Sequence, residues 1–181
     1  MTTSLDRALS LIADVPDYPK PGVLFKDITP LLADGPGFAA VIDALSAAIK
    51  KMDSGIDAIV GIESRGFILG GALANALGIG FVTVRKPGKL PRDVHRKEYA
   101  LEYGFDALEL HKDLLGPKNN VIIVDDVLAT GGTALACHDL VSLSGARVSG
   151  HVFLLEIGFL GGREVISKSH PEVAVASLLR T

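Results

Sequence analysis

Apolar and polar positions along this chain follow two periodicities in turn, and together they predict alternating helices and strands. A helix beginning near Pro36 carries apolar residues at one-face spacing, and Lys50 and Lys51 suit its carboxyl end. Short runs of β-branched residues predict strands that are buried on both faces. The strands fall at 56–62, 81–84, 121–124, 147–156 and 173–178, and helices at 67–77 and 133–144 lie between them. This βαβ order predicts an α/β fold with a mainly parallel twisted sheet and helices on both faces.

One uncharged stretch, residues 66–84, approaches the length of a transmembrane helix. Five glycines and Asn75 interrupt it, and Gly78 reads as the end of a helix followed by a turn. We therefore predict that this stretch forms core structure and that the chain does not span a membrane.

Length and composition are those of one small enzyme-sized domain. The 181 residues suffice for a single core, so we expect one domain over 1–181, with residues 1–30 contributing a small hood. A lone cysteine, Cys137, and an N-terminus without a signal-like pattern predict a cytoplasmic location. The formal charge of -3 lacks the excess of positive charge that is typical of proteins that bind nucleic acid.

Residues 121–133 carry the strongest chemical signal. Asp125 and Asp126 follow a buried strand, where paired acids can accept hydrogen bonds from sugar hydroxyls or help to hold Mg²⁺. The next loop offers an anion site, because glycines admit close approach and a helix N-terminus follows. Its residues are Ala129, Thr130, Gly131, Gly132 and Thr133. Each part alone is common in turns, but the combination describes a site for a ribose phosphate.

This strand, acid pair and loop resemble the phosphoribosyl diphosphate (PRPP) motif of the type I phosphoribosyltransferases. Segments 25–30, 61–67, 85–91 and 101–104 resemble successive signatures of the adenine phosphoribosyltransferase family, in order and at compatible spacing. The resemblance covers nearly the whole chain. It implies transfer of the phosphoribosyl group from PRPP to adenine, giving AMP and diphosphate. It also implies Mg²⁺ bound mainly through PRPP or diphosphate, and a homodimer.

The same resemblance suggests how the base is bound. The hood would bind adenine, with Phe25 as the stacking residue and Lys26, where the family often has arginine, acting through its backbone. Glu102 would accept or donate a proton at the purine ring, and Tyr103 belongs to the same signature. Asp125 and Asp126 would orient the ribose hydroxyls and favour a cationic sugar.

Two basic segments are candidates for binding the diphosphate. Ser64 and Arg65 follow the 56–62 strand, and the resemblance assigns them to diphosphate. A second group is either a solvated basic loop or a diphosphate-binding lid: Arg85, Lys86, Lys89, Arg92, Arg96 and Lys97. Because residues 87–99 lack apolar periodicity, we expect them to form a mobile lid that orders over PRPP.

Two other functions remain open at this point. A phosphoribosyltransferase for 6-oxopurines would keep the PRPP half and change only the base pocket. A PRPP-sensing regulator would keep the fold and bind nucleic acid, but it needs a DNA-binding unit for which the N-terminus has no room. Walker A, dinucleotide-binding and nucleophile-elbow motifs are absent, and the five histidines show no metal-ligand spacing.

Overall fold

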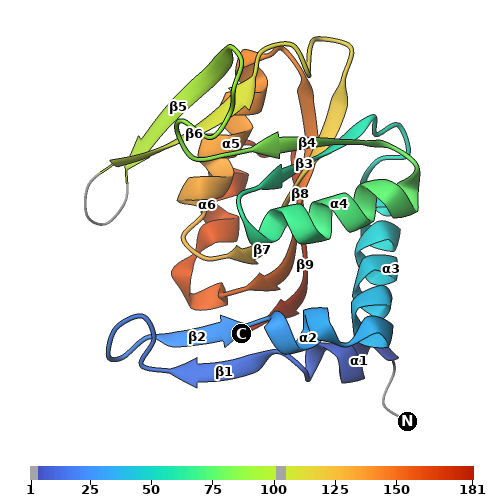
Figure 1. Cartoon of the computed structure of the whole chain (residues 1–181), viewed down its shortest axis with the longest axis vertical. Helices are drawn as coiled ribbons and strands as arrows, with labels where there is room; N and C mark the ends of the chain where they lie inside the picture. The colour runs from blue at the N-terminus through green and yellow to red at the C-terminus, as the bar shows by residue number, and fades with distance from the viewer. Residues whose placement is uncertain (1–3, 101–104) are drawn as a thin grey trace. The chain divides into compact units, whose positions relative to one another are not determined.

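The computed structural model describes residues 4–100 and 105–181 (Figure 1). The chain divides into two compact units, Met1–Ala44 and Leu45–Thr181. Helix α3, Gly35–Met52, begins in the first unit and ends in the second.

The first unit contains a small antiparallel ribbon and two short helices. Strands β1, Ala13–Pro16, and β2, Leu24–Asp27, pair so that Val15 lies opposite Phe25. Helices α1, Ser4–Leu9, and α2, Thr29–Ala33, flank this ribbon in sequence. Two hydrogen bonds of 2.9 and 2.8 Å from Arg7 to Asp34 fix α1 to the start of α3.

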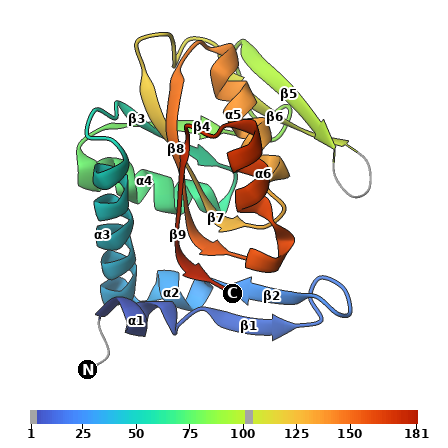
Figure 2. The ribbon, with the colours of Figure 1, turned by 180° about the vertical axis from the view of Figure 1, so that it is seen from behind.

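The second unit is built on a five-stranded parallel sheet, as the sequence predicts. Its strands are β3, Ala58–Ile62; β4, Gly80–Val84; β7, Asn120–Leu128; β8, Arg147–Glu156; and β9, Ala174–Arg180. They lie in the order β4-β3-β7-β8-β9, so β9 forms one edge (Figure 2). The predicted run 121–124 is the fully buried first half of β7, which continues through both acids to Leu128.

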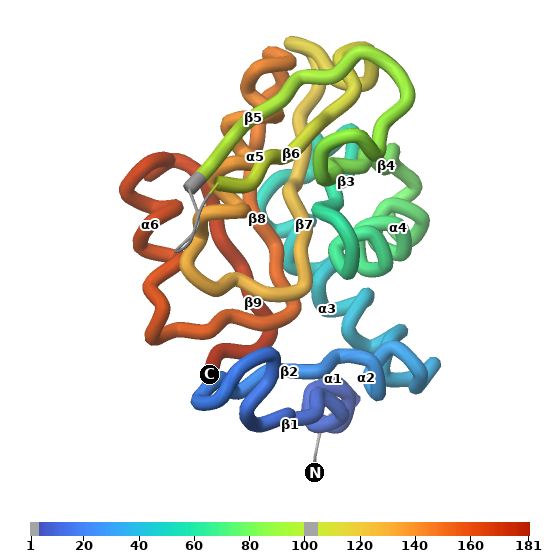
Figure 3. The backbone as a smooth tube through the Cα atoms, turned by 60° about the vertical axis from the view of Figure 1, so that its left-hand side comes forward, coloured from blue at the N-terminus to red at the C-terminus, as the bar shows by residue number. Residues whose placement is uncertain are grey.

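Helices cover both faces of the sheet, which confirms the predicted fold class. Helix α5, Gly132–Leu143, packs Cys137 and Leu140 against Val60 and Ile123. On the opposite face, α4, Arg65–Leu77, comes so close that a Cβ at Gly70 would lie 3.3 Å from Ile59. Figure 3 shows α4 and α5 on opposite sides of the strands. A short helix, α6, Gly162–Ser169, precedes β9, and a single 3-10 turn, η1, Gly158–Leu160, precedes α6.

The uncharged stretch 66–84 is core structure. It forms most of α4 and all of β4, joined at Gly78, whose φ of 68° caps the helix. Leu69 and Leu73 are fully buried. Within the described ranges, no helix is both long and apolar enough to cross a membrane.

The region expected to be a lid is in part a paired strand, and its closure over PRPP stays a prediction. Strand β5, Val94–Ala100, pairs antiparallel with β6, Phe105–His111, so half of the segment 87–99 is a strand rather than a loop. Tyr99 packs against the main core, and β6 buries Ala107, Leu108 and Leu110. The inward positions of β5 include His95 and Lys97, which are half-buried and not apolar, so a search for apolar periodicity misses this strand.

Candidate active site

The acid pair lies in the second half of β7. Asp126 is buried at 4 % exposure and forms an ion pair with Arg65, the first residue of α4. Asp125 is half-buried and accepts a 2.9 Å hydrogen bond from the backbone N–H of Asp126. The structure therefore brings together the acids after one strand and the cation after its neighbour, as the sequence predicts for adjacent strand ends.

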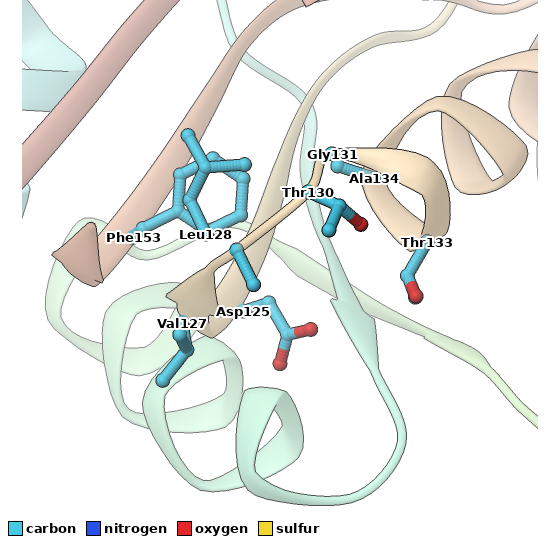
Figure 4. A pocket seen from close by; sticks show the side chains of 9 residues that line it. Asp125, Val127, Leu128, Thr130, Gly131, Thr133, Ala134 and Phe153 are labelled. Atoms are coloured by element: carbon cyan, nitrogen blue, oxygen red, sulfur yellow. The ribbon is translucent and has the colours of Figure 1, made fainter. Parts of the chain in front are cut away.

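A cavity of about 80 Å³ lies between the end of β7 and the first turn of α5 (Figure 4). Asp125 and Phe153 contribute to its wall. The predicted anion loop forms most of the remainder, through Ala129, Thr130, Gly131 and Thr133. Gly131 has a φ of 85°, which glycine adopts without strain, and it caps α5. The positive end of α5 and its free N–H groups thus border a cavity of a size suited to one phosphate.

A second cavity of about 250 Å³ adjoins the first and shares Asp125 and Thr133 with it. Glu63, Ser64 and Arg65 line one side of it. The other lining residues are Ile62, Lys86 and Asp126. A ligand that spans both cavities meets an anion loop, then two carboxylates, then two cations, which is the charge order of a ribose carrying phosphates at both ends.

The cations around the second cavity are held by carboxylates of the chain. Arg85 donates to Glu63, with its Nη2 3.1 Å from Oε1 and its Nε 3.3 Å from Oε2. The backbone N–H of Lys86 donates to the same carboxylate at 2.9 Å. The Lys86 ammonium is bonded to Asp106 on β6 and lies 3.2 Å from the hydroxyl of Tyr99.

Sequence reasoning missed Glu63, Tyr99 and Asp106. Glu63 directly precedes Ser64, so its position in the sequence could have marked it as a site residue. An acid beside an anion site repels the anion unless a cation pairs with it, which argued against Glu63. Nothing local marks Asp106, because its pairing with Lys86 depends on the β5–β6 ribbon. Lys89 is exposed and outside both cavities, and Arg92, Arg96 and Lys97 pair instead with surface carboxylates.

Electrostatics distinguish the acids of the site. Burial raises the pKa of Asp125 well above its usual value, and the adjacent Asp126 carboxylate raises it further. The hydrogen bond from Arg85 lowers the pKa of Glu63. Burial lowers the pKa of Lys86, but the bonds to Asp106 and Tyr99 outweigh burial and leave this pKa raised. The site therefore contains ionised pairs around one carboxyl group, Asp125, that resists ionisation.

Two of the four predicted base-binding residues belong to the first unit, and the other two fall outside the described residues. Phe25 packs edge-on against Tyr18, with ring centroids 5.2 Å apart. Lys26 forms a 2.5 Å ion pair with Asp14. Glu102 and Tyr103 fall in 101–104, beyond what the structure describes. The roles of all four remain predictions.

The residues of the second cavity are of the type that binds Mg²⁺ together with a phosphorylated substrate. Among residues 4–100 and 105–181, no group of three or more His, Cys, Asp or Glu side chains is arranged to hold a metal. Mg²⁺ in phosphate sites is commonly bound by one or two carboxylates, with substrate oxygens and water completing the octahedron. Asp125 and Asp126 are a donor set of this kind.

Comparison with known proteins identifies the family. A model described as a phosphoribosyl transferase domain matches residues 30–156. An adenine phosphoribosyltransferase from Synechococcus sp. is 59 % identical over 87 % of this chain and 89 % of its own. The crystal structure of the Thermoanaerobacter pseudethanolicus enzyme of that name is 44 % identical, with a TM-score of 0.91 over 98 % of this chain and 99 % of its own.

A third relative was solved with ligands bound. Adenine phosphoribosyltransferase from Saccharomyces cerevisiae, crystallised with an imino-altritol bisphosphate and adenine, is 38 % identical, with a TM-score of 0.91. The match covers 99 % of this chain and 100 % of that one. The chain therefore belongs to the phosphoribosyl transferase domain family and, within it, to the adenine phosphoribosyltransferases.

Proposed function

We propose that this enzyme transfers the 5-phosphoribosyl group from PRPP to adenine, forming AMP and diphosphate. The observation that carries the assignment is the pair of adjoining cavities that share Asp125 and Thr133. One is bordered by a helix N-terminus and the other by cations, and an acid pair lies between them. PRPP has the same sequence of groups: 5′-phosphate, ribose hydroxyls, diphosphate.

The 5′-phosphate would occupy the smaller cavity. Its ligands would be the backbone and hydroxyl groups of residues 129–133 at the start of α5. Asp125 and Asp126 would accept hydrogen bonds from the ribose hydroxyls. Fixing the phosphate and the hydroxyls orients the C1 atom toward the incoming base, and such positioning is a large part of catalysis in bimolecular reactions.

Diphosphate would occupy the larger cavity, against Ser64, Arg65 and Lys86. Arg85 and Lys89 would support that end of the site from the neighbouring loop, since the Lys89 carbonyl accepts a 3.3 Å hydrogen bond from Arg85. As the bond between C1 and the diphosphate oxygen breaks, a purine nitrogen forms the new bond to C1. The cations offset the charge of the leaving group, and the carboxylates stabilise the positive charge that develops on the ribose.

Mg²⁺ is part of this proposal. It would be held mainly by PRPP or diphosphate, with Asp125 and Asp126 as the carboxylates nearest to it, and it would supply positive charge that offsets the charge of the leaving group. Chelation with excess EDTA should then abolish AMP formation, and added Mg²⁺ should restore it.

Binding of adenine is assigned from family resemblance. Phe25 would stack on the ring, the Lys26 backbone would contact its edge, and Glu102 and Tyr103 would complete the pocket. The S. cerevisiae relative was crystallised with adenine, which supports adenine as the base. In this assignment Glu102 exchanges a proton with the purine ring as the new bond forms.

A product assay tests the proposed reaction. Purified enzyme, PRPP and Mg²⁺ should convert adenine to AMP and diphosphate, with much weaker activity on hypoxanthine, guanine and xanthine. If the enzyme prefers a 6-oxopurine, the assignment of adenine as the base is refuted, but the assignment of the PRPP site stands. Folded protein that forms no nucleotide from any of the four bases would refute the enzyme assignment altogether.

A homodimer and a cytoplasmic location complete the proposal. The homodimer is assigned from the family resemblance. Sedimentation equilibrium should give twice the mass of the chain. The buried free thiol of Cys137 does not require an oxidising compartment.

A further inference from the structure

The backbone of the small cavity is in direct contact with the start of α6. A Cβ on Gly162, the first residue of α6, would lie 2.3 Å from the carbonyl oxygen of Ala129 and 2.9 Å from the nitrogen of Gly131. A Cβ on Gly131 would lie 2.8 Å from the carbonyl oxygen of Gly162. Two glycines thus allow two main chains to touch, so the path of residues 129–131 depends on where α6 begins.

The beginning of α6 is held by an ion pair between half-buried Arg163 and buried Glu156. Arg163, the next residue, donates from Nε to both oxygens of Glu156, at 3.0 and 3.1 Å. Its Nη1 donates to the carbonyl of Val175 at 2.6 Å. Glu156 is only 1 % exposed and also accepts a 2.7 Å hydrogen bond from Ser177. These contacts fix α6 to β8 and β9.

The Arg163–Glu156 pair also lies beside the end of β7, through Glu156. Glu156 lies opposite Leu128 in the sheet, and the N–H of Ile157 donates to the Leu128 carbonyl at 2.9 Å. Ile166 of α6 packs in an apolar cluster with Leu128 and Phe153, two residues that line the small cavity. The network therefore supports both the wall and the loop of that cavity, although neither Glu156 nor Arg163 lines it.

We propose that Arg163 and Glu156 are positioning residues for the 5′-phosphate loop, acting through the contact of Gly162 with Ala129 and Gly131. The proposal rests on the assignment of that loop to the 5′-phosphate made above. A phosphate held by backbone N–H groups binds tightly only where their path is fixed before binding. Loss of the pair releases Gly162 and lets residues 129–131 move, and it leaves the larger cavity intact.

Two fragments of PRPP can be used to measure binding at each cavity separately. Ribose 5-phosphate probes the small cavity, diphosphate with Mg²⁺ probes the larger one, and titration calorimetry on the full chain measures both dissociation constants. Arg163→Gln should raise the constant for ribose 5-phosphate by up to about tenfold, because the charge-assisted bond that orders the loop is lost, and change that for diphosphate less than twofold. Gly162→Ala should act in the same direction, since its methyl group displaces Ala129.

Arg180→Gln is the matched control. It also removes an arginine 3.5 Å from Glu156, but Arg180 is 57 % exposed and belongs to β9 rather than α6. This variant should bind both ligands as the wild type does. Each variant is titrated well below its melting temperature, so that a general loss of stability does not enter the comparison.

The outcomes are distinct. The positioning role is overturned if Arg163→Gln binds ribose 5-phosphate as the wild type does, or if it binds both ligands more weakly to the same extent. Either result leaves the proposed reaction intact. Wild-type protein that forms AMP but binds no ribose 5-phosphate refutes the loop assignment and the inference with it. If Gly162→Ala does not fold, Arg163→Gln still decides.

Discussion

The proposed role of Asp125 needs an ionised carboxylate, but the surroundings of this side chain disfavour ionisation. Asp125→Asn should lower kcat/KM by roughly tenfold or more, the effect of losing a charged hydrogen bond of about 1.5 to 3 kcal/mol. The same change should raise the melting temperature at neutral pH, because it removes a carboxylate whose burial and proximity to Asp126 raise its pKa. Steady-state kinetics and thermal denaturation on one preparation measure both effects.

The sign of the stability effect depends on pH. A raised pKa means that the folded state retains the Asp125 proton at pH values where the unfolded chain has lost it. Wild-type stability therefore falls relative to Asp125→Asn as pH rises above about 4, the ordinary pKa of aspartate, and the two should converge below that value. Asp126→Asn is the matched comparison: it should lose activity and also stability, since it removes the ionised partner of Arg65. Two variants with equal activity to the wild type would show that these acids have no role in binding ribose.

Lys86 is shared between the substrate site and Asp106. If Asp106 competes with diphosphate for the ammonium, Asp106→Asn should lower the dissociation constant for diphosphate by about two- to fivefold, the size of a half-exposed ion pair. Calorimetric titration with diphosphate and Mg²⁺ measures this change. In a Lys86→Met background the Asp106 substitution should have no effect.

Asp113→Asn is the control for Asp106→Asn, because it removes another ion pair, with Arg92, that involves the region around the β5–β6 ribbon. It should leave diphosphate binding unchanged. Weaker binding of diphosphate by Asp106→Asn would mean that Asp106 orients Lys86 toward the ligand instead of competing for it.

At the scale of elements, the ribbon sets limits on which residues can close over PRPP. Residues 94–100 are paired with β6, and Lys97 is tied to Asp139 of α5 at 2.7 Å. The exposed loop before the ribbon contains Lys89 and Arg92. Trypsin should therefore cleave the free enzyme after these two residues much faster than after Lys97, and saturating Mg²⁺–PRPP should slow that cleavage severalfold.

Cleavage after Lys118, which is exposed in the turn before β7, serves as the internal standard of this experiment. Its rate should not respond to PRPP. Equal rates at Lys89 with and without PRPP would eliminate closure of the loop over the ligand.

The sheet was predictable from sequence and the ribbon was not, for a physical reason. Strands buried on both faces, such as β3 and β7, require continuous β-branched runs, and few elements besides a buried strand contain such runs. Strand β5 needs only a half-buried face, which His95 and Tyr99 supply with their apolar parts. The acids and the anion loop were found because they follow a buried strand directly. Glu156 and Arg163 were missed because their pairing depends on where α6 meets β8.

At the scale of the whole molecule, a buried histidine cluster couples stability to pH. His138 of α5 and His151 of β8 lie 3.0 Å apart, Nδ1 to Nε2, and the His170 ring stacks on His138 with centroids 3.6 Å apart. Burial lowers the pKa of His138 to about 4 and that of His151 to about 3, and neighbouring histidines add to the effect. Asp139 and Glu172 oppose it at His138.

Below pH 6.5 the unfolded chain binds protons that these two histidines cannot accept in the folded state. Stability should therefore be lost as pH falls from about 6.5 toward 4, by about 1.4 kcal/mol per pH unit for each histidine. In His151→Leu, the unfolding free energy measured by urea denaturation should depend less steeply on pH. The slope should fall by the amount that corresponds to one proton, about 1.4 kcal/mol per pH unit. His95→Gln, outside the cluster, is the control, and an unchanged slope in His151→Leu would exclude the cluster as the source.

The pairing of Arg65, Arg85 and Lys86 with Asp126, Glu63 and Asp106 bears on which cellular anions reach this site. A cell contains inorganic phosphate and many nucleotides, and a cavity with unpaired cations would collect them indiscriminately. Here an entering anion would compete with carboxylates that already pair with the cations, and a lone phosphate could replace few of them at once. On the proposed assignment, a magnesium diphosphate carried on a ribose would engage several of these cations together. If these carboxylates compete with the ligand, they would pair with the cations again when diphosphate leaves, so one exchange would both disfavour ambient anions and help to release the product.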